Sequence, residues 1–211
     1  NGKGNLNPTQ RILNVTTRKL ESFGTTVFAE MTALAQEHEA INLAQGFPDF
    51  EGPEEIVEAA VQALRSGNNQ YARTRGHPPL VQAIAEAQHR YYGLSYDPMT
   101  EVVVFSGATE GIAASLLGLL NTGDEVIVFQ PFYDSYLPGL ALAGAVPRLV
   151  TLHYPDFPLD VDALRAAVTE RTRMILLNTP MNPTGKVFSA EELQLIAQVC
   201  REHDLIAVPD E

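Results

Sequence analysis

The chain has 211 residues and is acidic, with 26 Asp and Glu against 14 Lys and Arg and a formal net charge of -12. Hydrophobic residues make up 45% and charged residues 19%, which is typical of a globular protein with a sizeable core and excludes disordered and fibrous chains. The negative charge repels phosphate backbones, so we expect no nucleic-acid partner.

No apolar run reaches the ~20 residues that a membrane-spanning helix needs, and the polar start lacks the apolar core of a signal peptide. We therefore expect a cytoplasmic protein without a membrane partner. Cys200 is the only cysteine, which excludes an intrachain disulfide. It falls on the apolar side of a predicted helix, so we interpret it as a core residue and not as a nucleophile.

The first 24 residues are polar and show no sustained period, which indicates an arm in which we expect no chemistry. Helical periodicity begins near Phe28 and returns after Pro53 and after Pro78, where Leu80 is expected on the apolar face. Loops bearing Gly, Pro or polar residues separate these helices.

From residue 102 onward, predicted strands and helices alternate. Apolar runs predict strands at residues 102–105, 126–129, 146–150, 174–177 and 205–208, and helical periods lie between them at residues 109–120, 135–143, 161–168 and 190–203. Apolar strands joined by helices favour an α/β fold with a mostly parallel sheet and helices on both faces. Ligands of such sheets bind where the strands end, so the loops there are the candidates for chemistry.

Four segments at predicted strand ends carry suggestive residues. A small-residue turn at residues 106–111 opens a helix, where free backbone N–H groups suit a phosphate, although such turns are often rich in Gly for conformational reasons alone. An aromatic cluster at residues 132–136 either plugs the core or stacks on a flat ring. An Asn-Pro-Thr-Gly turn at residues 182–185 and an acid at Asp210 follow later strands. Because all four segments follow strands of one predicted parallel sheet, we expect them to converge on one crevice.

In this order the segments resemble the class I aminotransferases, the fold type I pyridoxal-phosphate enzymes of the aspartate aminotransferase superfamily. The resemblance is most specific at residues 41–50, 69–71, 106–111, 131–136 and 178–186. The residues in these stretches are most similar to those of the kynurenine, glutamine and methionine aminotransferases and of the N-succinyldiaminopimelate aminotransferases. It implies an N-terminal arm and part of a small domain at residues 1–45, followed by the N-terminal portion of the large cofactor-binding domain at residues 46–211, with the remainder of the enzyme outside this chain.

The resemblance implies roles in binding pyridoxal 5'-phosphate. Gly107, Ala108 and Thr109 match the turn that holds the phosphate. Tyr133 matches the ring that stacks on the pyridine. Asp210 matches the carboxylate that faces the pyridine nitrogen and keeps it protonated, so that the ring accepts the electrons released with the substrate's Cα proton.

Three further residues match positions at the substrate side of such a site, and no metal is implied. Asn182 matches the asparagine that hydrogen-bonds the phenolic oxygen and helps to seat the substrate carboxylate. Gly46 matches a backbone contact near that carboxylate. Tyr71 matches a tyrosine that reaches the phosphate of the partner subunit, which implies a homodimer with shared active sites.

The implied activity is the transfer of an amino group from an amino acid to a 2-oxo acid. The lysine that holds the cofactor as a Schiff base is central to it, yet only Lys3, Lys19 and Lys186 are present, and none fits. We expect the ammonium of Lys186 to face solvent. The covalent lysine and the carboxylate-binding arginine are therefore expected beyond Glu211, and this chain alone is expected to be inactive.

Two alternatives stay open. Cysteine-conjugate β-lyase activity would use the same residues. A non-catalytic fragment or dimer partner is favoured by the missing lysine, but the intact Asp210 and Asn182 argue against it.

Overall fold

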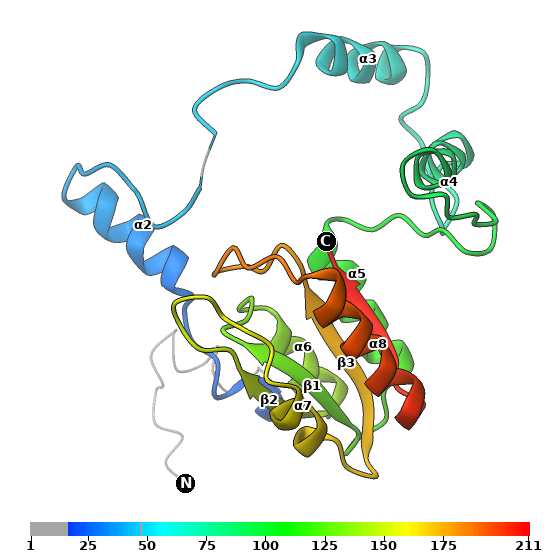
Figure 1. Cartoon of the computed structure of the whole chain (residues 1–211). Helices are drawn as coiled ribbons and strands as arrows, with labels where there is room; N and C mark the ends of the chain where they lie inside the picture. The colour runs from blue at the N-terminus through cyan, green and yellow to red at the C-terminus, as the bar shows by residue number, and fades with distance from the viewer. Residues whose placement is uncertain (1–16, 47) are drawn as a thin grey trace, which may run out of the picture. The chain divides into compact units, whose positions relative to one another are not determined.

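The computed structural model describes residues 17–46 and 48–211, and within them the strands form one parallel sheet. Phe47, Lys3 and most of the predicted arm lie outside the described residues. The strand order is β2-β1-β3-β4 and every neighbouring pair is parallel, so all strands end at the same edge (Figure 1). The strands are β1 (Glu125–Gln130), β2 (Val146–Thr151), β3 (Thr172–Asn178) and β4 (Ile206–Asp210). Four of the five predicted strands are thereby confirmed.

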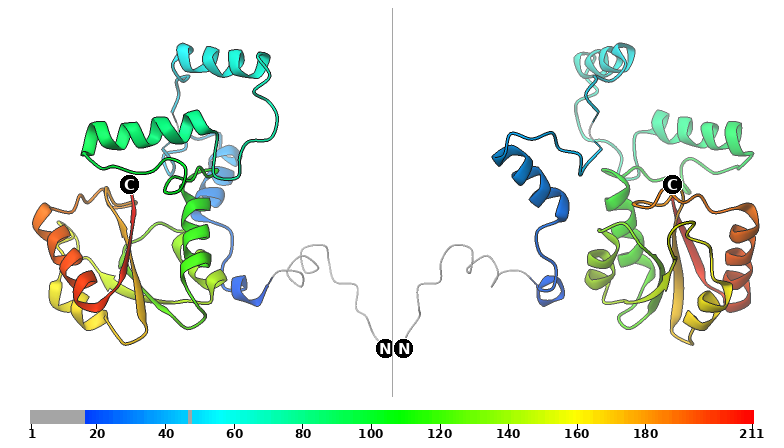
Figure 2. Two further views of the ribbon diagram at one scale, coloured as in Figure 1. Left: turned by 90° about the vertical axis from the view of Figure 1, so that its right-hand side faces the viewer. Right: turned by 60° about the vertical axis from the view of Figure 1, so that its left-hand side comes forward.

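Helices cover both faces of the sheet, as predicted from the alternating pattern (Figure 2). On β1, Val126 and Val128 pack into one core cluster, whereas Ile127 and Phe129 pack into another on the opposite face. Because both faces are buried, the strand is apolar at nearly every position. The first cluster lies under α5 (Ala108–Leu119) and α6 (Tyr136–Ala143), and the second under α7 (Val161–Ala167) and α8 (Ala190–His203).

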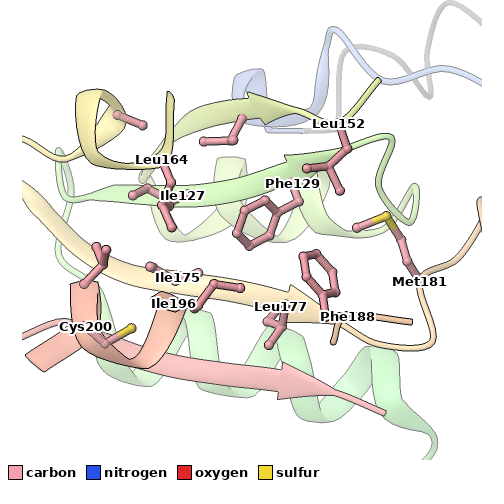
Figure 3. Close-up of a cluster of buried hydrophobic side chains, with 13 residues drawn as sticks. Ile127, Phe129, Leu152, Leu164, Ile175, Leu177, Met181, Phe188, Ile196 and Cys200 are labelled. Atoms are coloured by element: carbon pink, nitrogen blue, oxygen red, sulfur yellow. The ribbon is translucent and has the colours of Figure 1, made fainter. Parts of the chain in front are cut away.

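The cluster under α7 and α8 extends to the loop after β3 (Figure 3). The rings of Phe129 and Phe188 lie 5.4 Å apart between centroids at 55°, and Met181 is buried beside them in the same cluster. This packing anchors both ends of the loop that carries the Asn-Pro-Thr-Gly turn. Cys200 is buried in the same cluster, which confirms it as a core residue, and burial raises the pKa of its thiol.

The start of α8 shows how its sequence sets the helix boundary. The Ser189 side chain accepts a hydrogen bond from the backbone N–H of Glu192, and the Glu192 carboxylate accepts one from the backbone N–H of Ser189. This capping box satisfies two N–H groups that a helix start otherwise leaves without partners. The helix therefore begins at Ala190, as predicted.

Contacts within the chain divide the described residues into two compact units, one of residues 17–24 and 107–211 and a second of residues 25–106. The helices of the second unit are α2 (Val27–Glu37), α3 (Glu54–Arg65) and α4 (Pro78–Tyr92). Leu80 is 45% exposed, so its predicted place on the apolar face of α4 is wrong. The buried face begins one residue later, at Val81 and Ala85.

The predicted strand at residues 102–105 is also wrong. Val102 and Val104 pack with Val81 and Ala85 of α4, and the Val104 N–H donates to the carbonyl of Arg75 at 3.0 Å. No sheet ladder includes this segment within the described residues. Its apolar pattern therefore reflects burial against a helix, which the pattern alone does not distinguish from burial in a sheet.

Residues 17–24 belong to the unit that holds the sheet. The short helix η1 (Arg18–Leu20) places the Lys19 ammonium 2.7 Å from the carbonyl oxygen of Leu142, near the end of α6. Within the described ranges, no helix combines the length and apolarity needed to cross a lipid bilayer. The predicted division at residues 1–45 and 46–211 stays a prediction about the domains of a longer enzyme.

Candidate active site at the carboxyl edge of the sheet

Chemistry-bearing side chains gather where the parallel strands end. β3 ends at Asn178, β4 ends at Asp210, and Tyr133 and Tyr136 follow the end of β1. The start of α5 lies at this same edge in each view (Figures 1 and 2). The predicted placement of these segments at one edge of the sheet is therefore confirmed, and their convergence on one ligand site stays a prediction.

Asp210 is held by a side chain from α6, which is distant in sequence. The hydroxyl of Tyr136 donates a hydrogen bond to Oδ2 of Asp210 at 2.5 Å. Tyr136 is 1% exposed, and burial, reinforced by the hydrogen bond to Asp210, raises the pKa of its phenol far above its ordinary value. The phenol therefore keeps its proton at neutral pH and acts as the donor.

Tyr133 is oriented by the same tyrosine. The two rings meet edge to face, with centroids 5.8 Å apart and planes at 78°. Tyr133 is half-buried, so part of its ring stays accessible at the carboxyl edge of the sheet. This placement suits a ring that stacks on a flat ligand.

Asn178 links the end of β4 to the Asn-Pro-Thr-Gly turn. Its side-chain Nδ2 donates to the backbone carbonyl of Asp210 at 2.8 Å, and its Oδ1 accepts from the backbone N–H of Asn182 at 2.6 Å. Asn178 is 9% exposed, so these bonds satisfy an amide that would be costly to bury alone. The backbones that carry Asp210 and Asn182 are thereby fixed relative to one another.

The Asn182 side chain itself is exposed, and its amide makes no hydrogen bond with the described residues. The turn closes behind it, because the N–H of Met181 donates to the carbonyl of Lys186 and the N–H of Gly185 donates to the carbonyl of Met181, at 2.8 and 2.7 Å. Gly185 adopts a φ of 72°, which glycine tolerates without strain. The turn thus presents an amide to the site from a rigid base.

Lys186 does not face solvent, so that prediction is wrong. Its side chain is 8% exposed, and its ammonium lies 2.9 Å from the carboxylate of Glu192 and 4.7 Å from the ring centroid of Phe188. The carboxylate is fixed by the backbone N–H groups of Ser189 and Leu159, each at 2.9 Å. The Glu192 carboxylate on α8, which the two backbone N–H groups hold in place, therefore binds the Lys186 ammonium and keeps it out of solvent.

The turn at residues 107–109 forms the start of α5. Gly107 is the residue before the helix and has a φ of 88°, a conformation that a residue with a side chain rarely adopts. Gly107 has no side chain that could cap the helix, and the N–H groups of Ala108 and Thr109 lie in its first turn, which is exposed. Such a turn offers donors and a positive helix end to an anion.

Gly46 and Tyr71 lie in the second unit, at residues 25–106. Gly46 is exposed directly after a bend, with space around it for a side chain. Tyr71 follows α3 and is fully exposed. Their assigned contacts with substrate and with a partner subunit therefore remain predictions.

Two functional candidates were missed by sequence reasoning, although both lie in segments that it singled out. Tyr136 was grouped with the aromatic cluster, and Asn178 was taken as the first residue of the loop after an apolar strand. A polar residue that closes a buried strand was a usable signal for Asn178, because it must find partners. The contact of Tyr136 with Asp210 spans 74 residues of sequence and had no local signal.

Comparison with known proteins identifies the family of the chain. The family model described as aminotransferase class I and II matches residues 38–211. A probable N-succinyldiaminopimelate aminotransferase of Mycobacterium tuberculosis is 50% identical over 200 residues, which are 93% of this chain and 50% of that protein. A methionine aminotransferase of Escherichia coli is 42% identical over 193 residues, with coverage of 92% and 50%. The human kynurenine–oxoglutarate transaminase 1 is 38% identical over 208 residues, with coverage of 92% and 49%.

Solved structures show the same fold. The N-succinyldiaminopimelate aminotransferase of Mycobacterium tuberculosis superposes with a TM-score of 0.89 at 50% identity, covering 93% of this chain and 52% of that one. The Escherichia coli methionine aminotransferase also gives 0.89, at 41% identity with coverage of 93% and 52%. The chain thus spans about half the length of the relatives it matches.

Proposed function

Because the chain belongs to the class I and II aminotransferase family, we propose that the full-length protein transfers an amino group from an amino acid to a 2-oxo acid, with pyridoxal 5'-phosphate as cofactor. The observation that carries this proposal is the fixed position of Asp210 at the end of β4. There its carboxylate accepts a hydrogen bond from the Tyr136 hydroxyl. The Asn178 side chain hydrogen-bonds both the backbone of Asp210 and the backbone of Asn182, and so links the end of β4 to the turn that presents Asn182.

The residues present fit this cofactor. The exposed first turn of α5, with donors at Ala108 and Thr109 after the N-cap Gly107, suits its phosphate. The accessible ring of Tyr133 suits its pyridine, and the Asn182 amide suits its phenolic oxygen. When bound, the cofactor supplies an acceptor for the electrons released with the Cα proton of the substrate.

Each protein group then has a defined task. Asp210 holds a proton on the pyridine nitrogen, because a carboxylate beside it stabilises the charged ring. Asn182 orients the phenolic oxygen and the substrate carboxylate. Gly46 leaves room for that carboxylate, because a side chain at its position would approach the substrate.

Assembly and location are part of the proposal. Tyr71 is fully exposed in this chain, which supports a role in the site of a second subunit. We therefore propose a homodimer with shared active sites. We also propose a cytoplasmic location, which the acidic composition supports.

Neither of the described lysines is placed to hold the cofactor. The Lys19 ammonium contacts the carbonyl of Leu142, near the end of α6 opposite Tyr136. The Lys186 ammonium is held by Glu192. The covalent lysine is therefore proposed outside the present residues, and residues 1–211 alone are proposed to be inactive. Borohydride reduction of this chain with the cofactor, followed by peptide mapping, should give no single stoichiometric adduct, and such an adduct on Lys186 would contradict the assignment.

The relatives carry names of three different amino-acid substrates, and these supply the candidates for the donor. They are N-succinyldiaminopimelate, methionine and kynurenine. We propose a donor of this kind, with the choice among them decided by assay.

Isotope transfer tests the activity directly. The full-length protein is incubated with cofactor, a 15N-amino donor and an unlabelled 2-oxo acid, and the products are read by mass spectrometry. Transamination places 15N in the amino acid formed from the 2-oxo acid. Release of the label as ammonia from a cysteine conjugate would support β-lyase activity instead, and no transfer with any donor would support a non-catalytic protein.

A further inference from the structure

One oxygen of the Asp210 carboxylate accepts a hydrogen bond within the described residues, and the other does not. Oδ2 accepts the hydrogen bond from the Tyr136 hydroxyl, whereas Oδ1 accepts no hydrogen bond from the described residues. A carboxylate has room for several donors, so the second oxygen is left to a ligand. The single anchored oxygen therefore sets the direction in which the other one points.

Tyr136 is built rigidly into the fold. It is the first residue of α6, and its ring lies in the core cluster with Ile112 and Leu116 of α5. Its backbone N–H donates to the carbonyl of Tyr133, and the two rings meet edge to face. A ring fixed on several sides loses little further freedom when its hydroxyl is bound, so the hydroxyl is preorganised for Asp210.

Burial makes this hydrogen bond obligatory for the tyrosine. A phenol that is 1% exposed must find a partner within the protein, and Asp210 is the acceptor that it reaches. A hydrogen bond to a charged group is stronger than one between neutral groups. The contact thus fixes the direction in which the Asp210 carboxylate points.

We propose that Tyr136 is a positioning residue for Asp210, which directs Oδ1 toward the ring nitrogen of the cofactor and keeps the proton between them on the ring. This inference rests on the proposed function, because it requires a ring nitrogen at Oδ1. Tyr136 itself need not touch the cofactor. Its effect passes through Asp210, which distinguishes it from Tyr133, whose proposed contact is with the ring face.

The physical reason is the direction of the charged oxygen. A carboxylate beside a protonated ring nitrogen stabilises the charge on the ring, and it does so best when its oxygen points at the N–H. Without the Tyr136 hydroxyl the carboxylate is free to rotate away from this direction. The ring nitrogen then loses its proton more readily, and the ring becomes a weaker electron acceptor.

Nuclear magnetic resonance of the full-length protein, loaded with cofactor labelled with 15N in the ring, tests this directly. Tyr136→Phe removes one oxygen and keeps the ring that packs in the core, so the fold is retained, as circular dichroism verifies. The expected result is a 15N signal shifted toward the unprotonated value, with kcat reduced about tenfold. The matched control is Tyr154→Phe, at a tyrosine that is 85% exposed, and it should leave both quantities unchanged.

A double-mutant cycle separates positioning from general structural damage. If Tyr136 acts through Asp210, Tyr136→Phe should lower kcat much less in an Asp210→Ala background than in the wild type. A wild-type 15N signal in Tyr136→Phe, or equal losses of kcat in both backgrounds, would overturn the proposal. A wild-type protein that binds no labelled cofactor would overturn the proposed function itself, which is a different result because it precedes any comparison of variants.

Discussion

Lys186 places its ammonium 2.9 and 3.1 Å from the two carboxylate oxygens of Glu192 and so ties the loop after β3 to the first turn of α8. The same carboxylate accepts hydrogen bonds from the backbone N–H groups of Ser189 and Leu159. Burial alone would disfavour its charge, but the hydrogen bonds from Lys186 and from the backbone outweigh burial and hold the pKa of Glu192 below its usual range. The position of the loop that carries Asn182 therefore depends on the carboxylate of Glu192.

Replacing that acid should weaken the fold. Glu192→Gln leaves Lys186, which is 8% exposed, without a charged partner, and we expect the free energy of unfolding to fall by about 2 kcal/mol. Urea unfolding of the full-length protein measures this loss. Glu170→Gln, at an exposed turn, is the matched control and should have little effect. Equal stability of the two variants would show that the pair does not anchor the loop.

Asn178 offers a test of how the two halves of the site are joined. Asn178→Asp has nearly the same shape and can still accept from the Asn182 N–H, but it loses the donor to the Asp210 carbonyl and places a negative charge beside it. We expect kcat to fall about tenfold or more, with weaker retention of the cofactor. Steady-state kinetics and the cofactor content after dialysis measure both effects.

The comparison for that variant is Asn121→Asp, which lies before β1 and away from the carboxyl edge. It should keep the turnover and cofactor content of the wild type. Wild-type turnover in Asn178→Asp would remove Asn178 from the account of the site.

The buried carboxyl of Glu125, far from the site, allows a prediction of how the free energy of unfolding changes at low pH. Glu125 is 1% exposed, and hydrogen bonds from Thr169 and Arg171, at 2.7 and 2.6 Å, lower the pKa of its carboxyl despite burial. Because the folded pKa lies below the unfolded value, this carboxylate stabilises the fold above about pH 4.3, and the stabilisation is lost as the pH falls through the folded pKa.

Glu125→Gln should therefore lower the free energy of unfolding at pH 7, by roughly 2 kcal/mol. The difference from the wild type should shrink as the pH is lowered below about 4. Denaturant unfolding at a series of pH values gives this difference. A gap that stays constant or widens toward acid would mean that the pKa shift has the opposite sign.

Local sequence patterns predicted the sheet and its helices well. Burial on both faces makes the strands apolar, and a capping box such as that of Ser189 and Glu192 marks a helix start with residues only three positions apart. They also predicted that Asp210 and the Asn182 turn share one edge, since this follows from parallel strands alone. They failed at residues 102–105, where an apolar run packs on a helix. Contacts between distant residues were likewise missed, as with Lys186 and Glu192 or Tyr136 and Asp210, because no periodicity encodes them.

The exposure of Tyr71 leads to a prediction about assembly. Its hydroxyl has no described partner in this chain, so we expect Tyr71→Phe to weaken cofactor retention several-fold by removing a hydrogen bond to the phosphate of a partner subunit. Dialysis followed by fluorescence of the bound cofactor measures retention.

Mixed dimers show whether that contact crosses between subunits. A dimer of one Tyr71→Phe subunit and one Asp210→Ala subunit carries both defects in one site and neither in the other when the sites are shared. Such a mixture should regain part of the wild-type activity. A monomer with full activity at working concentration would contradict shared sites.

The role of Asp210 is the centre of this account, and one comparison tests it most directly. The cofactor content and kcat of full-length Asp210→Ala are measured beside those of the wild type, with Asp156→Ala, at an exposed turn, as the matched control. We predict that the variant keeps most of its cofactor, which the α5 turn and Tyr133 still bind, while kcat falls by about a thousandfold or more because the ring nitrogen loses its charge partner. Turnover near that of the wild type in Asp210→Ala, with the cofactor bound, would contradict the account.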